Sequence, residues 1–179
     1  MSNSSGKKNT EMREYNESIL SNMYEEYYDK IARYAYLRVG KKDEAEDIAG
    51  EVFLKALKSL NSYRDRGIPM QAWLFRIAHN LVIDYFRKMH KHKTVPIYDV
   101  QIEGGVDPAI EAEQSDELAR VKKAMEQLTR EQIEVLRLRF FGELTSREAG
   151  KVLNKSDGAV REMQRAAIEK LRNILIIDE

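Results

Sequence analysis

The run NSYRDRGIPMQAWLFRIAHNLVIDYFRKMHKHK, Asn61 to Lys93, joins a polar loop to one long amphipathic segment. Gly67 and Pro69 mark the loop, and the spacing of the apolar residues that follow predicts a helix from about Met70 to Met89. When successive residues are placed about 100° apart, the apolar ones fall on one broad face that we expect to be core. These residues are Leu74, Phe75, Ala78, Leu81, Val82, Tyr85, Phe86 and Met89.

The opposite face of the same helix has the composition of a nucleic-acid surface. Arg and Lys contact phosphates, Asn can pair with a base edge, and aromatic rings stack on unpaired bases. The face contains Trp73, Arg76, Asn80, Asp84, Arg87 and Lys91, and the preceding loop adds Tyr63, Arg64 and Arg66. The alternative is a solvated face with one semi-buried Trp. The basic tail FRKMHKHK, which has no acid, favours nucleic acid that is partly single-stranded.

Composition indicates an all-α protein without a cofactor. The 179 residues are 42% hydrophobic and 34% charged, with three Pro and no sustained apolar/polar alternation. Zero cysteines exclude disulfides and thiolate sites, and the three His show no metal-ligand pattern, so we expect no metal. No run has the length of a membrane span and the N-terminus lacks a signal peptide, so we expect no membrane insertion and a cytoplasmic location. The net charge of zero argues against a protein that binds DNA unaided.

Before Asn61 the sequence predicts a tail and two helices. Residues 1–14 are polar and expected to be disordered, and a helix is expected from Ser18 to about Gly40. Asp43 and Glu46 are spaced as a capping pair that opens a second helix. The outer face of that helix carries Glu44, Asp47, Glu51 and Leu54.

This acidic outer face is either a plain solvated surface or a docking site for a basic protein surface. Charge complementarity steers association, and the exposed Leu54 would add apolar burial. An enzyme is disfavoured, because catalytic carboxylate pairs need a shielded pocket and these acids lie on one convex face.

After Lys93 the pattern breaks and then becomes helical again. Residues 96–114 form an acidic linker with Gly104 and Gly105, which we expect to be flexible, and a second domain is expected over residues 115–179. Two capping boxes, Thr129 with Gln132 and Thr145 with Glu148, open successive helices in that domain.

The end of the second domain has the outline of a helix-turn-helix. A short helix ending near Leu153, a turn of Asn154 to Ser156 and a longer helix from Asp157 predict this motif. Near the start of such a second helix, side chains reach base edges and phosphates of the major groove. The candidate DNA contacts are Ser156, Arg161, Gln164 and Arg165. An αα-hairpin with a basic surface is the alternative.

The two domains, in this order, resemble the extracytoplasmic-function (ECF) sigma factors of bacterial RNA polymerase, in the sigma-70 superfamily. The matching runs are YEEYYDKIARYAYLRVGKKDEAEDIAGEVFLKAL, PMQAWLFRIAHNLVIDYFRK and LTREQIEVLRLRFFGELTSREAGKVLNKSDGAVREMQRAAIEKLR. The resemblance implies a first domain, region 2 (residues 15–95), that docks on the polymerase clamp and opens the promoter minus-10 element. It implies a second domain, region 4 (residues 115–179), that reads the minus-35 element, and an anti-sigma factor as a typical partner.

The resemblance also assigns roles to positions. Asp47 and Glu51 match clamp-binding positions, and Tyr63 and Arg64 fall in the loop that captures a flipped base. The promoter-facing helix would present Trp73, Arg76, Asn80 and Arg87, and the recognition helix would present Arg161 and Arg165. The acidic linker resembles the segment that threads towards the RNA exit path.

Two departures from the family pattern concern affinity and specificity. Gly50 stands where relatives often carry Gln, and a mid-helix Gly costs about 1 kcal/mol relative to Ala. Met163 and Gln164 replace a frequent Arg-Leu pair, so the minus-35 preference is not transferable. Rival hypotheses are a stand-alone helix-turn-helix regulator, which leaves Asp47, Glu51 and the Trp73 face without a role, and a helical protein adaptor, which leaves the arginines of the last helix unexplained.

Overall fold

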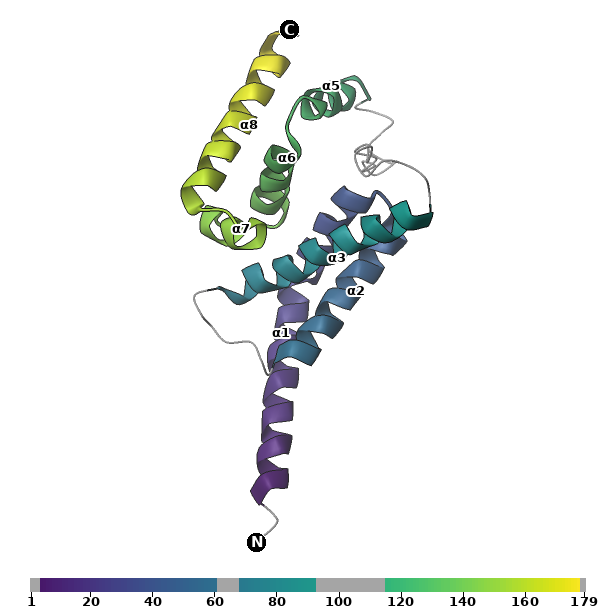
Figure 1. The fold of residues 1–179 in the computed structure, drawn as a ribbon, viewed down its shortest axis with the longest axis vertical. Coiled ribbons are helices and arrows are strands. Elements are labelled where there is room, and N and C mark those ends of the chain that lie inside the picture. The colour runs from purple at the N-terminus through teal and green to yellow at the C-terminus, as the bar shows by residue number, and fades with distance from the viewer. Residues whose placement is uncertain (1–3, 61–67, 93–114, 178–179) are drawn as a thin grey trace.

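The computed structural model describes residues 4–60, 68–92 and 115–177, and all regular structure within these ranges is helical. The N-terminal unit contains α1 (Ser4–Val39), α2 (Lys42–Ser59) and α3 (Met70–His92) (Figure 1). The C-terminal unit contains α5 (Ser115–Glu126), α6 (Arg130–Leu136), the π-helix η2 (Arg137–Phe141), α7 (Ser146–Leu153) and α8 (Asp157–Ile177). The predicted all-α class is therefore confirmed, while the predicted linker of residues 96–114 lies outside the described ranges.

The start of α1 corrects the prediction of a disordered tail. Residues 1–14 were expected to lack structure, but α1 begins at Ser4 and its first half projects beyond the other helices (Figure 1). Packing against the core is recorded from Ile19 onward. Upstream of it, good helix formers such as Glu11 and Met12 continue the same helical register.

The junction of α1 and α2 is made by glycine, not by the predicted capping pair. Gly40 has a φ of 73° and donates its N–H to the carbonyl of Tyr36, which ends α1 as expected. The helix α2 begins at Lys42, and Lys41 at its N-cap makes no side-chain cap bond. The expected cap by Asp43 is therefore wrong, because the cap lies two residues earlier, at Lys41, and Asp43 lies inside the first turn, where the helix dipole favours it.

The core face predicted for α3 is largely confirmed. Leu74, Phe75, Ala78, Leu81 and Val82 are buried. Burial of this face decreases towards the C-terminal end of the helix, where two aromatic residues, Tyr85 and Phe86, are only partly buried. Met89 is 37% exposed, so its assignment to the core is wrong, because α3 at this point lines an open groove with α2.

The C-terminal unit is a helix-turn-helix, α7 and α8, preceded by α5, α6 and η2. Both predicted capping boxes are present, at Thr129 and at Thr145. Asn154 ends α7 in the left-handed conformation, with a φ of 56°, which Asn tolerates better than most residues. A small core of this unit is formed by Leu128, Ile133, Leu136 and Ala167.

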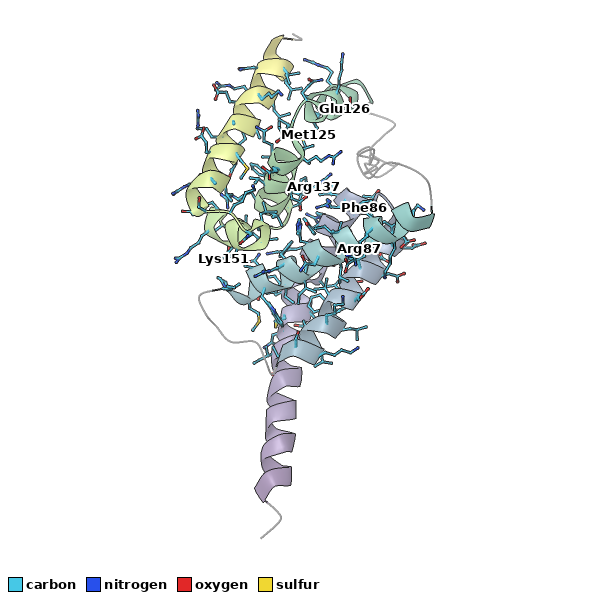
Figure 2. The ribbon with its side chains drawn as sticks, viewed as in Figure 1. Phe86, Arg87, Met125, Glu126, Arg137 and Lys151 are labelled. Atoms are coloured by element: carbon cyan, nitrogen blue, oxygen red, sulfur yellow. The ribbon has the colours of Figure 1, made fainter. Side chains whose placement is uncertain are left out.

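The larger core runs through both units. It joins the buried faces of α1, α2 and α3 to residues of the C-terminal unit. The latter are Val135, Leu138, Leu144, Ala149, Val152 and Val160. Helix α7 packs on α3 and η2 packs on α1, and side chains of the two units meet along this boundary (Figure 2). The two units are thus docked on one another.

Candidate functional site

The acidic outer face of α2 is open to solvent and borders a groove. Asp47 and Glu51 are exposed, Glu44 is half-buried, and Leu54 keeps 60% of its surface exposed. A groove of about 400 Å³ between α2 and α3 is lined by the three carboxylates. Glu51 also pairs with Lys55 at 3.3 Å on the same helix. The structure therefore brings the predicted docking residues together on one accessible surface.

The groove continues onto the C-terminal half of α3. Its lining there includes Asp84, Tyr85 and Lys88. Four carboxylates line the groove, three from α2 and one from α3, against two lysines, Lys55 and Lys88, so the lining keeps an excess of negative charge that suits a basic partner surface.

The face of α3 predicted to meet nucleic acid is partly confirmed as accessible. Arg76, Asn80 and Arg87 are exposed, and Arg87 pairs with Asp84 at 2.9 Å. The predicted contacts Tyr63 and Arg64 lie outside the described residues. The accessible cations and amide leave this face able to contact phosphates and bases.

Trp73 is partly covered, as the alternative of a solvated face with one semi-buried Trp expected. Its side chain is half-buried and packs against the main core, as does Ile77 one turn later. An indole is large enough to cover the edge of a core while keeping part of its ring exposed. Trp73 therefore combines a packing role with a surface that can still meet a ligand.

The second helix of the helix-turn-helix, α8, presents two exposed arginines, each held by acids of the same helix. Arg161 pairs with Asp157 at 3.1 Å, and Arg165 pairs with Glu162 at 2.7 Å and with Glu169 at 3.3 Å. The hydrogen bond between Arg165 and Glu162 raises the pKa of the guanidinium and lowers the pKa of the carboxyl. Both arginines are thus positioned on one face, ready to exchange a carboxylate for a phosphate or base.

The other two predicted contacts on the recognition element also have structural partners. The hydroxyl oxygen of Ser156 accepts a hydrogen bond from the Ala159 N–H at 3.2 Å and so caps α8. Gln164 is half-buried, and its amide oxygen accepts a hydrogen bond from Arg139 Nε at 2.8 Å. Helical periodicity does not indicate the second contact, because Arg139 lies in the π-helix 25 residues earlier.

The spacing of α7 and α8 depends on a close backbone approach at Gly150. The N–H of Lys155 donates to the Gly150 carbonyl at 2.8 Å, and a Cβ on Gly150 would lie 2.6 Å from the Lys155 carbonyl oxygen. Gly150 therefore allows the tight turn between the two helices.

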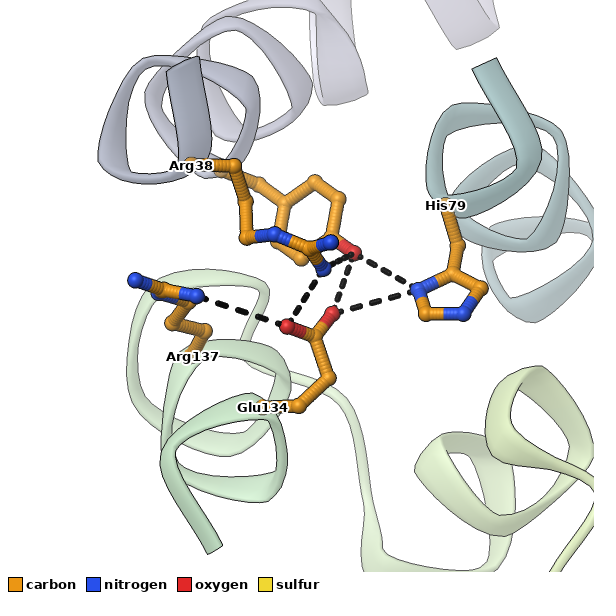
Figure 3. A network of polar contacts seen from close by, with 5 residues as sticks. Arg38, His79, Glu134 and Arg137 are labelled. Carbon is orange, nitrogen blue, oxygen red and sulfur yellow. Dashed lines mark hydrogen bonds and ion pairs between the residues drawn. The ribbon is translucent and has the colours of Figure 1, made fainter. Parts of the chain in front are cut away.

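Sequence reasoning missed a buried polar cluster between the two units. Glu134 of α6 is 7% exposed and contacts Tyr34 and Arg38 of α1 and His79 of α3 (Figure 3). Arg137 of η2 lies 3.6 Å from the same carboxylate. The sequence pattern that could have indicated this cluster is the acid Glu134 within the apolar run IEVLRL. Its partners, however, lie far away in the sequence.

Several classes of site were not found in the part of the chain that the structure describes. None of its groups of His, Asp or Glu could hold a metal ion. Among the described helices, none is both long and apolar enough to cross a membrane.

Comparison with known proteins places these surfaces in a family. Residues 23–92 match the Sigma-70 region 2 model, and residues 124–173 match the Sigma-70, region 4 model. The ECF RNA polymerase sigma factor BldN of Streptomyces coelicolor is 33% identical over 86% of this chain, and the chain spans only 59% of the length of BldN. The ECF RNA polymerase sigma factor SigD of Mycobacterium tuberculosis is 31% identical, with 82% of this chain and 72% of SigD covered.

A solved structure supports the same fold. CnrH, determined in complex with the cytosolic domain of CnrY, aligns with a TM-score of 0.66 at 23% identity, over 95% of this chain and 96% of CnrH. A helical region 2 joined to a helix-turn-helix region 4 defines a sigma-70 protein. The chain belongs to the ECF RNA polymerase sigma factors, which are non-enzymatic transcription initiation factors.

Proposed function

We propose that this sigma factor binds core RNA polymerase through the acidic face of α2 and uses its two units to engage the two elements of a promoter. The polymerase-binding residues are Glu44, Asp47, Glu51 and Leu54. The minus-10 contacts are Tyr63, Arg64, Trp73, Arg76, Asn80 and Arg87, and the minus-35 contacts are Ser156, Arg161, Gln164 and Arg165.

The observation that carries the polymerase contact is the exposure of an apolar side chain beside carboxylates. Leu54 is 60% exposed, on the same helix as the exposed Asp47 and Glu51. Nothing within the described chain covers Leu54, whereas a basic protein surface would bury it and pair with the acids.

The promoter contacts divide between positioning and opening. Arg161 and Arg165 suit duplex DNA, because arginines near the start of a recognition helix reach the major groove. Arg76 and Asn80 lie on a helix that also carries the partly exposed Trp73, which suits unpaired bases. Unstacking bases costs a few kcal/mol per step, and capture of the unstacked bases on this face would offset that cost. The polymerase itself performs the chemistry.

A protein inhibitor is a further partner of this function. The sigma factor RpoE of Bartonella quintana, which shares the fold, has been solved in complex with the anti-sigma factor NepR. By similarity, an anti-sigma factor is the partner that would keep this chain from polymerase, and the chain would act in the cytoplasm, where polymerase and promoters are found.

Binding to bacterial core RNA polymerase tests the proposal. The double variant Asp47→Arg/Glu51→Arg should weaken binding by about tenfold or more, because reversed charges would repel a basic surface. A matched control is Glu25→Arg/Glu46→Arg, which makes the same change in net charge at exposed acids outside the groove. Equal affinity of wild type and both variants would reject the α2 contact. If no form bound polymerase while the free protein shifted duplex DNA, a stand-alone regulator would be the better function.

A further inference from the structure

The carboxylate of Glu134 is enclosed by polar groups from three other elements. The contact between the two units is specific here, because it depends on hydrogen bonds and an ion pair to this one carboxylate. Arg38 Nη1 lies 2.5 Å from Glu134 Oε2, and His79 Nδ1 lies 3.2 Å from Oε1. The Tyr34 hydroxyl donates to Oε1 and also lies 3.0 Å from His79 Nδ1. Tyr34, Arg38 and His79 all belong to the N-terminal unit (Figure 3). Most of the partners of this buried acid are therefore supplied across the boundary between the units.

A second contact lies at the turn that ends η2. Lys30 Nζ lies 2.6 Å from Glu143 Oε2, and Gln71 Nε2 donates to the Gly142 carbonyl at 3.0 Å. Gly142 approaches α3 so closely that a Cβ there would lie 2.9 Å from Phe75 Cε1. Polar contacts and close packing at this turn thus both stabilise the same docked arrangement of the two units.

A buried ion held in this way favours one discrete arrangement. In the docked state the charge of Glu134 is matched by Arg38 and by hydrogen bonds, which compensates for the loss of water. Partial separation would leave buried charges without partners, which costs several kcal/mol, whereas complete separation would return them to water. We therefore expect a docked state and a separated state, with little population between them.

The docked arrangement conflicts with the geometry of a promoter. Elements centred near positions minus-35 and minus-10 are about 25 base pairs apart, which is about 85 Å of duplex at 3.4 Å per pair. In the docked state α7 and η2 of region 4 lie directly on α3 and α1 of region 2 (Figure 1). The 22 residues from 93 to 114 could reach at most about 75 Å if fully extended, so the length of this segment allows the two units to separate.

We propose that Glu134 is a latch that holds the free sigma factor in a closed state, in which it cannot engage both promoter elements at once. The latch must open when the two units bind their separate sites on the polymerase and promoter. This inference rests on the proposed function, in which each unit contacts a different element. Its regulatory consequence is a lower apparent affinity for the transcription machinery, because only the open fraction can bind with both units.

Zero-length cross-linking of the free full-length protein tests the closed state. A carbodiimide joins a lysine amine to a carboxylate in direct contact as an amide, with loss of water to the reagent. In the wild type we expect a Lys30–Glu143 cross-link between the units and a Lys155–Glu131 cross-link within region 4, from an ion pair of 2.8 Å. Peptide mass spectrometry separates the two products.

The variant Glu134→Gln should lower the Lys30–Glu143 product by about fivefold or more and leave the Lys155–Glu131 product unchanged, because Arg38 would lose its buried counter-ion. The matched control Glu131→Gln changes the same residue type on the same helix and should show the reverse pattern. Arg38→Gln repeats the test from the other side of the boundary, in case the first variant fails to fold. An undiminished Lys30–Glu143 product in both latch variants, or its absence in the wild type, would overturn the proposal.

Affinity for bacterial core RNA polymerase tests the consequence. Glu134→Gln should bind about tenfold more tightly than wild type, while Glu131→Gln should bind like wild type. Loss of the cross-link without a gain in affinity would show that the contact is packing alone and would overturn the latch. If the wild type did not bind polymerase at all, the proposed function would fail, and the cross-links alone would decide whether the closed state exists.

Discussion

At the residue scale, the two arginines that we propose as minus-35 contacts are already held in place by acids of their own helix. Arg161 and Arg165 already form ion pairs within α8. Each pair is exposed, so it contributes little to stability and is readily exchanged for a phosphate or a guanine edge. The acids keep the two guanidinium groups extended over one face of the helix.

We predict that Arg161→Ala lowers the affinity of the polymerase-bound factor for minus-35 duplex by about 1–3 kcal/mol, the range for one bidentate contact to a base. Fluorescence anisotropy of labelled promoter duplex measures the effect. Arg172→Ala is the control, because Arg172 is an exposed arginine farther along the same helix. Equal losses in the two variants would indicate a general effect of charge and would contradict a specific role for Arg161.

Prediction from the sequence succeeded for single residues whose role depends on their own helix. The exposure of Asp47, Arg76 and Arg161 followed from helical periodicity, which places residues on faces. Glu134 could not be assigned in this way. Its partners Arg38 and Tyr34 lie 96 and 100 residues away in the sequence, so only the tertiary packing reveals them.

At the element scale, two glycines within helices differ in the space around them. A Cβ added at Gly50 in α2 would meet nothing within 4 Å, whereas one added at Gly150 in α7 would collide with the backbone of the turn. Both look alike in the sequence, because each follows an alanine in an amphipathic helix. Their difference arises from neighbours that helical periodicity does not specify.

We predict that Gly50→Ala raises the free energy of unfolding by about 0.5–1 kcal/mol, because it removes the entropic cost of a helical glycine without a clash. Gly150→Ala should lower it by about 1–3 kcal/mol, as expected for overpacking. Urea denaturation followed by circular dichroism measures both. A stabilising Gly150→Ala would contradict the close approach of α7 to the following turn.

The same reasoning explains the errors at helix ends. The spacing of Asp43 and Glu46 fits a capping pair, but the left-handed Gly40 ends α1 and lets α2 begin at once, with Lys41 at the cap. The capping boxes at Thr129 and Thr145 were predicted correctly, because there the hydroxyl and the acid or amide three residues later satisfy each other locally.

At the scale of the whole molecule, the sequence predicts two helical units but not their docking. Each unit supplies its own amphipathic helices, and the acidic segment between them separates the two patterns. The shared core is hidden from this reasoning, because Phe75 fits the inner face of α3 equally well whether its neighbours come from α1 or from Gly142. Docking therefore had to be learned from the three-dimensional arrangement.

The charge state of Glu134 connects this docking to pH. Burial would raise the pKa of this carboxyl, but hydrogen bonds from His79 and Tyr34 and the charge of Arg38 together lower it from 4.5 to about 2. Arg137 also faces the group, from η2. Because the pKa is lower in the folded protein, the carboxylate contributes stability that is complete above pH 4.5 and is lost as the pH falls towards 2.

We therefore predict that the stability difference between wild type and Glu134→Gln shrinks progressively between about pH 4.5 and 2, by at most about 3 kcal/mol. The comparison removes the contribution of the other carboxyls, because they are present in both proteins. Urea denaturation at a series of pH values, followed by circular dichroism, gives the difference. Glu131→Gln is the matched control, since it makes the same substitution at an exposed acid of the same helix whose pair with Lys155 is screened by water. A stability difference that persisted unchanged down to pH 2 would mean that the Glu134 charge does not hold the two units together.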